Sequence, residues 1–299
     1  MPRIFVTGGT GFVGKHVVRA LLARGFLVRC LVRPGSEGDL RGFESLDRVP
    51  GDVLQPEGLA AAAEGCAALI HLVGIIRERF TQGLTFERLH VQATVNMLAV
   101  AKQAGIPRFL HMSALGTRAG ARARYHQTKW RAEEAVRASG TAWTIFRPSV
   151  IFGRGDELIS TLARMIKRLP VVPVLGAGQY RLQPVAVEQV ADGFARTLTT
   201  GATVGQTYDV AGPVAYPFVE LLDEIGAALG RRRVRKVHVP LSLVGVVTKA
   251  LEWLPFYPVT SDQLTMLAEE SVTDPTRFYT DLAIAPEPLA DGLRRLLAT

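Results

Sequence analysis

The sequence predicts an α/β fold in which helices cover both faces of one parallel sheet. Three observations support this: short apolar runs alternate with helical patterns, glycines separate them, and a glycine motif directly follows the first run. The 299 residues can bury a substantial core, and a composition of 48% hydrophobic and 21% charged residues is ordinary for a folded chain. We therefore expect a doubly wound sheet that binds ligands at the carboxyl ends of its strands.

Strands and helices alternate regularly as far as residue 153. The pattern predicts strands at 3–7, 27–32, 49–53, 68–73, 108–112 and 142–147, and helices at 15–23, 56–63, 85–104 and 127–139. The mixed region after it has predicted helices at 157–169, 188–199 and 218–229 and strands at 171–175, 183–187 and 207–211. We expect residues 1–153 to form the core of the sheet. Residues 154–299 should add a last core strand, further helices and a smaller lobe over the ligand cleft.

The strongest motif lies between the first strand and the first helix, where glycines stand three residues apart. Gly8 allows a tight turn, Gly11 lets the backbone approach a pyrophosphate, and Gly14 lets the helix pack closely on the sheet. The N-terminus of the helix offers free N–H groups and its positive dipole end to a phosphate. The sequence therefore predicts a Rossmann-type nicotinamide dinucleotide site, contacted by Thr7, Gly8, Thr10, Gly11, Phe12, Val13 and Gly14.

The end of the second strand bears on the choice of cofactor. Sites that prefer NAD(H) place an acid there for the ribose 2′-hydroxyl, whereas NADP(H) sites use an arginine for the 2′-phosphate. Here the strand ends without an acid and Arg33 follows it, and a guanidinium can bind a phosphate through two parallel bonds. We expect NADP(H) to be preferred over NAD(H). The alternative is that Arg33 is one more surface arginine.

Other cofactor contacts are expected after the third and fourth strands. Asp52 and Val53 end the third strand, where Asp52 is placed to accept a hydrogen bond from the adenine amino group. Val73 and Gly74 end the fourth strand, where a small residue lets the chain pass close to the cofactor. His71 before them is interpreted as a packed structural histidine. The six histidines show no metal-ligand spacing, so no metal site is predicted.

A tyrosine and a lysine stand four residues apart at the start of the helix before the sixth strand. On a helix this spacing places the side chains of Tyr125 and Lys129 on one face. A nearby ammonium favours the phenolate and would lower the pKa of Tyr125 toward neutral pH, as proton transfer requires. We predict that this pair faces the nicotinamide end of the site.

These motifs resemble the short-chain dehydrogenase/reductase superfamily, in its extended and atypical branch, the NAD-dependent epimerase/dehydratase group. The resemblance is carried by the G-x-x-G-x-x-G spacing, Asp52, the Tyr125 and Lys129 pair and the stretch 147–153, and Asn96 matches the helix asparagine of the branch. Within that branch, the stretches 71–76, 147–156 and 183–185 are similar to proteins like subunit nine of the respiratory complex I alpha subcomplex.

The resemblance implies roles for particular residues. Tyr125 would be the general acid/base of hydride transfer, Lys129 would also hold the nicotinamide ribose, and Pro148 and Val150 would border the nicotinamide. A hydroxyl after the fifth strand normally completes this set.

In this sequence the position expected for that hydroxyl falls on Ala114. Ser113 is then the nearest substitute, with Thr117 next. An alanine in place of this hydroxyl argues against a complete catalytic set, but it does not affect the prediction that the protein binds a cofactor.

Three functions are consistent with these residues. The first is an NADP(H)-dependent oxidoreductase or epimerase that acts on a hydroxyl or carbonyl group of a small molecule. The second, motivated by Ala114, is a non-catalytic NADPH-binding sensor, assembly factor or accessory subunit of a respiratory complex. The third is a weak peripheral contact with a membrane through the aromatic segment 253–257. Neither the substrate nor the oligomeric state follows from the sequence.

The charge pattern does not indicate a nucleic-acid partner. The formal net charge is +8, but its one dense run, Arg231–Lys236, lacks interleaved aromatics and is interpreted as a solvated approach to a strand. With only two cysteines and a glycine motif that follows the first strand directly, we expect a cytoplasmic protein. The alternative location is the inner face of the membrane.

Overall fold

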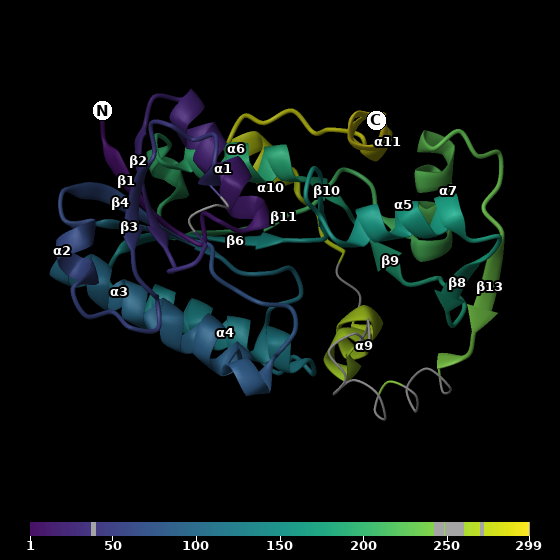
Figure 1. Ribbon diagram of the computed structural model, residues 1–299, viewed down its shortest axis with the longest axis horizontal. Coiled ribbons are helices and arrows are strands. Elements are labelled where there is room, and N and C mark those ends of the chain that lie inside the picture. Colours follow the sequence, from purple (N-terminus) through teal and green to yellow (C-terminus); the bar gives the residue numbers. More distant parts are fainter. Residues whose placement is uncertain (37–39, 242–247, 249–259, 270–271, 299) are drawn as a thin grey trace.

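The computed structural model describes residues 1–36, 40–241, 248, 260–269 and 272–298. The aromatic segment 253–257, predicted above as a membrane contact, lies outside these residues. In the part of the chain that is described, no helix has the length and apolar character needed to cross a membrane. Figure 1 shows the helix-covered sheet at one end of the molecule and a smaller lobe at the other.

Seven parallel strands form the main sheet, in the order β11-β6-β5-β4-β1-β2-β3. On either side of β1 the chain continues in opposite directions across the sheet, to β2 and to β4, and such a switch point is where doubly wound folds bind ligands. The predicted Rossmann-type α/β fold is therefore confirmed. The strands are β1 (Arg3–Thr7), β2 (Leu27–Val32), β3 (Asp47–Pro50), β4 (Cys66–His71), β5 (Arg108–Met112), β6 (Ala142–Pro148) and β11 (Gln206–Val210).

Helices bury the apolar side chains on both faces of this sheet. In Figure 1, α1, α6 and α10 lie above the sheet and α3 and α4 lie below it. Leu21 and Phe194 belong to the upper core, and Met97 and Val136 belong to the lower one. The elements are α1 (Phe12–Ala23), α2 (Leu59–Ala63), η2 (Phe80–Gln82), α3 (Ala93–Gln103), α4 (Arg124–Arg137), α6 (Val187–Thr197), η4 (Gly201–Thr203) and α10 (Thr276–Asp281).

A third hydrophobic core, which includes Leu162, Leu222 and Ile225, holds the smaller lobe together. Short strands pair within and beside it: β7 with β10, β8 with β13, and β9 with β12. Its elements are β7 (Ile151–Phe152), α5 (Leu158–Arg168), β8 (Val172–Leu175), β9 (Arg181–Leu182), β10 (Val185–Ala186), β12 (Tyr216–Pro217), α7 (Phe218–Ala228), β13 (Lys236–Val239) and α11 (Leu289–Leu297). Helix α9 (Ser261–Ala268) lies outside this core, against α4.

Three predicted strands are misplaced. The fourth strand, predicted at 68–73, is Cys66–His71, because its partner β1 ends at Thr7, opposite His71, so Val73 and Gly74 follow the strand. The third strand, predicted at 49–53, is Asp47–Pro50 because the chain then turns: Asp52 Oδ1 accepts from Leu54 N at 2.9 Å. The strand predicted at 183–187 is reduced to Val185–Ala186, since Pro184 before it has no N–H and α6 begins at Val187.

The helices predicted at 15–23 and 56–63 are observed at Phe12–Ala23 and Leu59–Ala63, and two further predicted helices also differ. The helix predicted at 85–104 begins as a π-helix, η3 (Glu87–Gln92), before α3 follows. The helix predicted at 127–139 begins at Arg124, so Tyr125 lies in the first turn of α4. This places Tyr125 where the backbone N–H groups of a helix have no partners within the helix.

A buried carboxylate joins α4 to the sheet. Glu133 has no exposed side-chain surface and accepts from Arg147 Nε at 2.8 Å and Nη2 at 2.6 Å. It also accepts from Arg137 Nη2 at 2.6 Å. Because Arg147 lies in β6, this ion pair fixes the rotation of α4 and thus the direction in which its other side chains point.

We predict that Glu133→Gln lowers the free energy of unfolding by about 2–4 kcal/mol, because it leaves two half-buried guanidinium groups without their shared carboxylate. The neighbouring Glu134→Gln is the matched control. Glu134 also pairs with Arg137 but is 54% exposed, so its loss should cost about 0.5 kcal/mol or less. Urea unfolding of both variants measures the difference. Equal effects of the two substitutions would contradict the conclusion that Glu133 joins α4 to the sheet.

Candidate functional site

Backbone contacts in the turn from β1 into α1 require glycine at positions 8 and 14. Gly8 has a φ of +77°, and a Cβ there would stand 3.0 Å from the backbone of Leu72 and of Val73. A Cβ on Gly14 would stand 2.1 Å from the carbonyl oxygen of Gly8. Both glycines are therefore explained by contacts inside the protein.

Gly11 has a different explanation. It is exposed, its φ is −72°, and a Cβ would meet only the carbonyl oxygen of Gly8, at 3.3 Å. The N-cap residue, Gly11, has no side chain to cap the N-terminus of α1, and the first turn of α1 has no acid. The result is a bare helix N-terminus at the carboxyl edge of the sheet, which fits a pyrophosphate.

The remaining predicted residues of this loop differ in their surroundings. The Thr7 hydroxyl is buried and lies 2.7 Å from His71 Nδ1, so it is already used within the protein. The ring of Phe12 packs edge-on against His16 at a centroid distance of 5.8 Å. Thr10 and Val13 are half-buried beside it.

Arg33 and Asp52 lie toward the β2 and β3 side of the loop. Arg33 is exposed directly after β2. Asp52 is half-buried, and Oδ1 of its carboxylate is taken up by the turn that it forms. Val53 is buried, and Asn96 Nδ2 donates to its carbonyl oxygen at 2.8 Å. Asn96 therefore holds in place the segment expected to border the adenine.

Lys129 lies on the other side of the loop. Its Nζ donates to the carbonyl oxygen of Met112 at 3.0 Å, and it would stand 2.9 Å from a Cβ on Gly74. Burial lowers the pKa of Lys129 to about 8, against the opposing effect of Glu133, so the group is an ammonium at neutral pH. Gly74, which is exposed, and Val73, which is half-buried, form the chain that passes this ammonium.

Tyr125 is half-buried one turn before Lys129. Its ring lies edge-on to Phe86, His90 and His126, with centroids 5.2–5.7 Å away. Burial raises the pKa of Tyr125 to about 12. The expectation that Lys129 lowers this pKa is wrong for the structure, because desolvation is the cause that acts here and the ammonium is bound to a carbonyl oxygen instead.

The expected third catalytic group is turned into the protein. Ser113 is buried, its N–H donates to the carbonyl oxygen of Phe146 at 2.7 Å, and its hydroxyl bonds Thr117 Oγ1 at 3.4 Å. Ala114 beside it is also buried.

The loops after β5 and β6 are tied together by their backbones. The carbonyl oxygen of Pro148 accepts from Leu115 N, and that of Val150 accepts from Val185 N, both at 2.9 Å. The ends of β5 and β6 thus form one wall, which Val150 connects to the smaller lobe.

Three buried histidines lie beneath this region; the sequence predicted His71 as a packed structural histidine, which is confirmed, but did not point to His90 or His111. His90 Nδ1 lies 2.8 Å from Thr128 Oγ1, and its Nε2 contacts the carbonyl oxygen of Ile75 at 2.9 Å. His71 stacks on His111 at 5.7 Å. Burial and the Lys129 charge lower the pKa values of all three histidines, that of His71 to about 3, so they are neutral. Within the described residues, no three His, Cys, Asp or Glu side chains are placed to hold a metal ion.

Comparison with known proteins gives the family. The NAD(P)H-binding family matches residues 8–164, more than half of the chain. A ceramide reductase from Caulobacter vibrioides is 34% identical over 201 residues, which cover 66% of this chain and 62% of that protein, so less than two thirds of its length is matched. The alpha subcomplex subunit 9 of mitochondrial NADH dehydrogenase (ubiquinone) from Arabidopsis thaliana is 29% identical over 306 residues, 95% of this chain and 74% of that subunit.

The solved structures agree with the fold. UDP-glucuronic acid 4-epimerase from Bacillus cereus, solved with UDP-glucuronic acid and NAD, superposes with a TM-score of 0.76 at 18% identity and covers 99% of this chain and 98% of its own. The chain therefore belongs to the NAD(P)H-binding family, with the fold of the extended short-chain dehydrogenase/reductases.

Proposed function

We propose that this protein is an NADP(H)-dependent oxidoreductase that acts on a carbonyl or hydroxyl group. One observation carries the proposal: Tyr125 and Lys129 share a face of α4 at the carboxyl edge of the sheet, with the Lys129 ammonium beside the bare backbone of Gly74. This arrangement puts a proton donor and a fixed positive charge on the β4 and β5 side of the glycine loop, where the nicotinamide end of a dinucleotide would lie.

The protonation states favour carbonyl reduction. A pKa of about 12 keeps Tyr125 a phenol at neutral pH, so it can donate its proton to the carbonyl oxygen. A bound nicotinamide dinucleotide would supply the hydride to the carbonyl carbon. Lys129, whose Nζ uses one proton on Met112, keeps others for a ribose hydroxyl. The Tyr125 phenolate would then recover a proton from solvent.

Apolar side chains suggest the class of substrate. Ile76 is 51% exposed and Phe80 is 68% exposed, on the segment that follows Gly74. The relative named as a ceramide reductase is a reason to include long-chain lipids among the carbonyl compounds tested. A long-chain lipid substrate would lie in a membrane, so the proposal includes a location in the cytoplasm at the inner face of the membrane.

A non-catalytic, NADPH-binding accessory role is the second candidate. The observation in its favour is Ser113, whose hydroxyl bonds Thr117, next to the apolar Ala114. The similarity to a complex I subunit over 95% of this chain points the same way.

Tyr125→Phe is expected to reduce turnover by about 100-fold or more while leaving dinucleotide affinity unchanged, because it removes the transferred proton and keeps the ring. Tyr216→Phe, in the smaller lobe, is the control and should keep full turnover. The measurement is NADPH oxidation with a panel of ketones that includes long-chain lipids. Turnover unaffected by Tyr125→Phe, or no turnover with any ketone, would favour the accessory role.

Arg33→Ala is expected to weaken NADPH binding by about 10- to 100-fold and to leave NADH binding unchanged, because charge-assisted bonds to a phosphate contribute about 1.5–3 kcal/mol. Arg168→Ala, an exposed arginine on α5, controls for the loss of a surface charge. Calorimetric titration with each dinucleotide measures both affinities. Equal losses for NADPH and NADH, or none, would rule out Arg33 as the 2′-phosphate ligand.

A further inference from the structure

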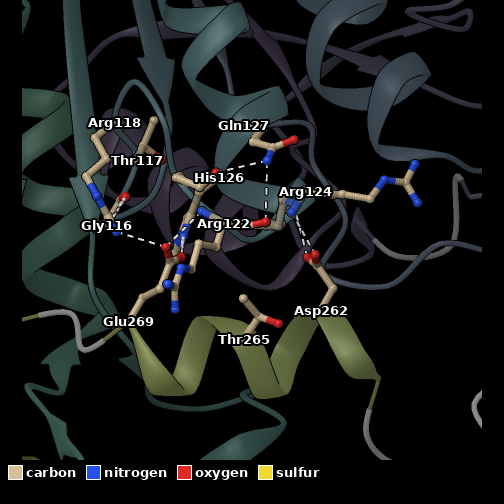
Figure 2. A network of polar contacts seen from close by, with 12 residues as sticks. Gly116, Thr117, Arg118, Arg122, Arg124, His126, Gln127, Asp262, Thr265 and Glu269 are labelled. Atoms are coloured by element: carbon tan, nitrogen blue, oxygen red, sulfur yellow. Dashed lines mark hydrogen bonds and ion pairs between the residues drawn. The ribbon is translucent and has the colours of Figure 1, made fainter. Parts of the chain in front are cut away.

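Helix α9 lies against the start of α4, although more than 120 residues separate them in the sequence (Figure 1 and Figure 2). None of its residues is fully buried. Its own N-terminus is satisfied by a capping box between Thr260 and Gln263. Because α9 contributes nothing to the interior of a hydrophobic core, polar contacts must supply much of what holds it on α4.

The first of these contacts caps α4. Residue Ala123, at the N-cap position of α4, has no side-chain oxygen and forms no cap. Asp262 of α9 takes over this function: Oδ1 accepts from Arg124 N at 2.7 Å, and Oδ2 accepts from Tyr125 N at 3.1 Å. A carboxylate on the first N–H groups of a helix is favourable both as a cap and toward the helix dipole.

The second contact lies two turns further along α9. Glu269 Oε1 accepts from Arg122 N and from Arg118 Nη2, each at 2.8 Å, and Oε2 lies 3.3 Å from His126 Nδ1. Its side chain is only 6% exposed. Although burial raises it, these hydrogen bonds hold the pKa of Glu269 below its ordinary value, so the group stays charged.

The two carboxylates therefore act on the same short segment. Seven residues separate Asp262 from Glu269, which brings both side chains to one side of α9. Figure 2 shows them pointing from α9 into the loop and the first turn of α4. The N–H groups that they bind include that of Tyr125 itself.

We infer that Asp262 and Glu269 are positioning residues for Tyr125. The sequence before α4 provides no cap, and an uncapped first turn frays. The second residue of that turn is Tyr125, so the docking of α9 fixes the backbone from which the phenol projects. A helix distant in the sequence thus completes the site. The inference rests on the proposed function only for what Tyr125 does once it is in place.

Hydrogen–deuterium exchange of the full-length protein tests this without a substrate. In Asp262→Ala, amides in the peptide covering 118–126 should exchange about 10-fold faster, as loss of a cap worth about 1.4 kcal/mol requires. Asp262→Asn, which keeps one acceptor oxygen, should recover part of the protection. Thr265→Val is the matched control, because among the described residues the Thr265 hydroxyl donates to the carbonyl oxygen of Ser261 within α9, so its loss should leave the start of α4 unchanged.

Peptides from β1 and β4 serve as the internal reference. Unchanged exchange at 118–126 in Asp262→Ala would overturn the inference, and so would an equal rise in β1 and β4, which would show a general loss of stability. With a substrate in hand, Asp262→Ala should lower kcat about 10-fold with the NADPH dissociation constant unchanged, and Asp262→Asn should restore part of it. If exchange at 118–126 is faster in Asp262→Ala but turnover is the same in Tyr125→Phe as in the native protein, the capping role of Asp262 stands and the proposed function is refuted.

Discussion

The first turn of α1 packs so closely on the loop before it that a single methyl group at residue 14 would stand 2.1 Å from the carbonyl oxygen of Gly8. This contact sets the direction of α1, and α1 in turn packs with α6 on the upper face of the sheet. It also aims the bare N-terminus of α1 at the edge where the parallel strands end. The same close packing that builds the core therefore builds the anion site.

Helix α4 connects this site to the rest of the molecule at three levels on one face. Glu133 binds the sheet through Arg147, Lys129 binds the end of β5 through Met112, and Tyr125 is reached from α9 through Asp262. Each level is separated from the next by four residues, about one turn. The contact of Glu133 with Arg147 fixes α4 on the sheet, and the contact of Asp262 with Tyr125 depends on α9. The position of Tyr125 therefore depends on both contacts.

Strands were predicted correctly where the local sequence pattern alone marks both of their ends. The bounds 3–7, 27–32 and 108–112 are the observed ones, because each is a short, largely apolar run with a glycine or proline within four residues of its ends. The third strand failed because Asp52 bonds its own backbone, a local competition that the apolar pattern does not show. The glycine loop was predictable because its spacing is itself a sequence pattern, although the contact that requires Gly8, with the backbone of Leu72 and Val73, is distant in the sequence.

Some groups that complete the site come from segments distant in the sequence, and this explains why they were not identified from the sequence. Glu133 continues the spacing of Tyr125 and Lys129, so the sequence did contain a signal for it. The sequence does contain the capping box that begins α9, yet nothing in it says that Asp262 would cap another helix. The shift of the Tyr125 pKa was predicted with the wrong sign, because the pattern shows the ammonium four residues away and does not show the burial.

The most direct test of the account is a fluorescence titration of the protein with NADPH, for the native chain and for Gly11→Ala. Gly201→Ala, an exposed glycine with open space around its Cβ position, is the control. The account predicts saturable binding by the native chain and the control, and at least about 10-fold weaker binding by Gly11→Ala, because its methyl group occupies the approach of the pyrophosphate. Undiminished affinity in Gly11→Ala, or no binding by the native chain, would contradict the claim that this loop holds a dinucleotide.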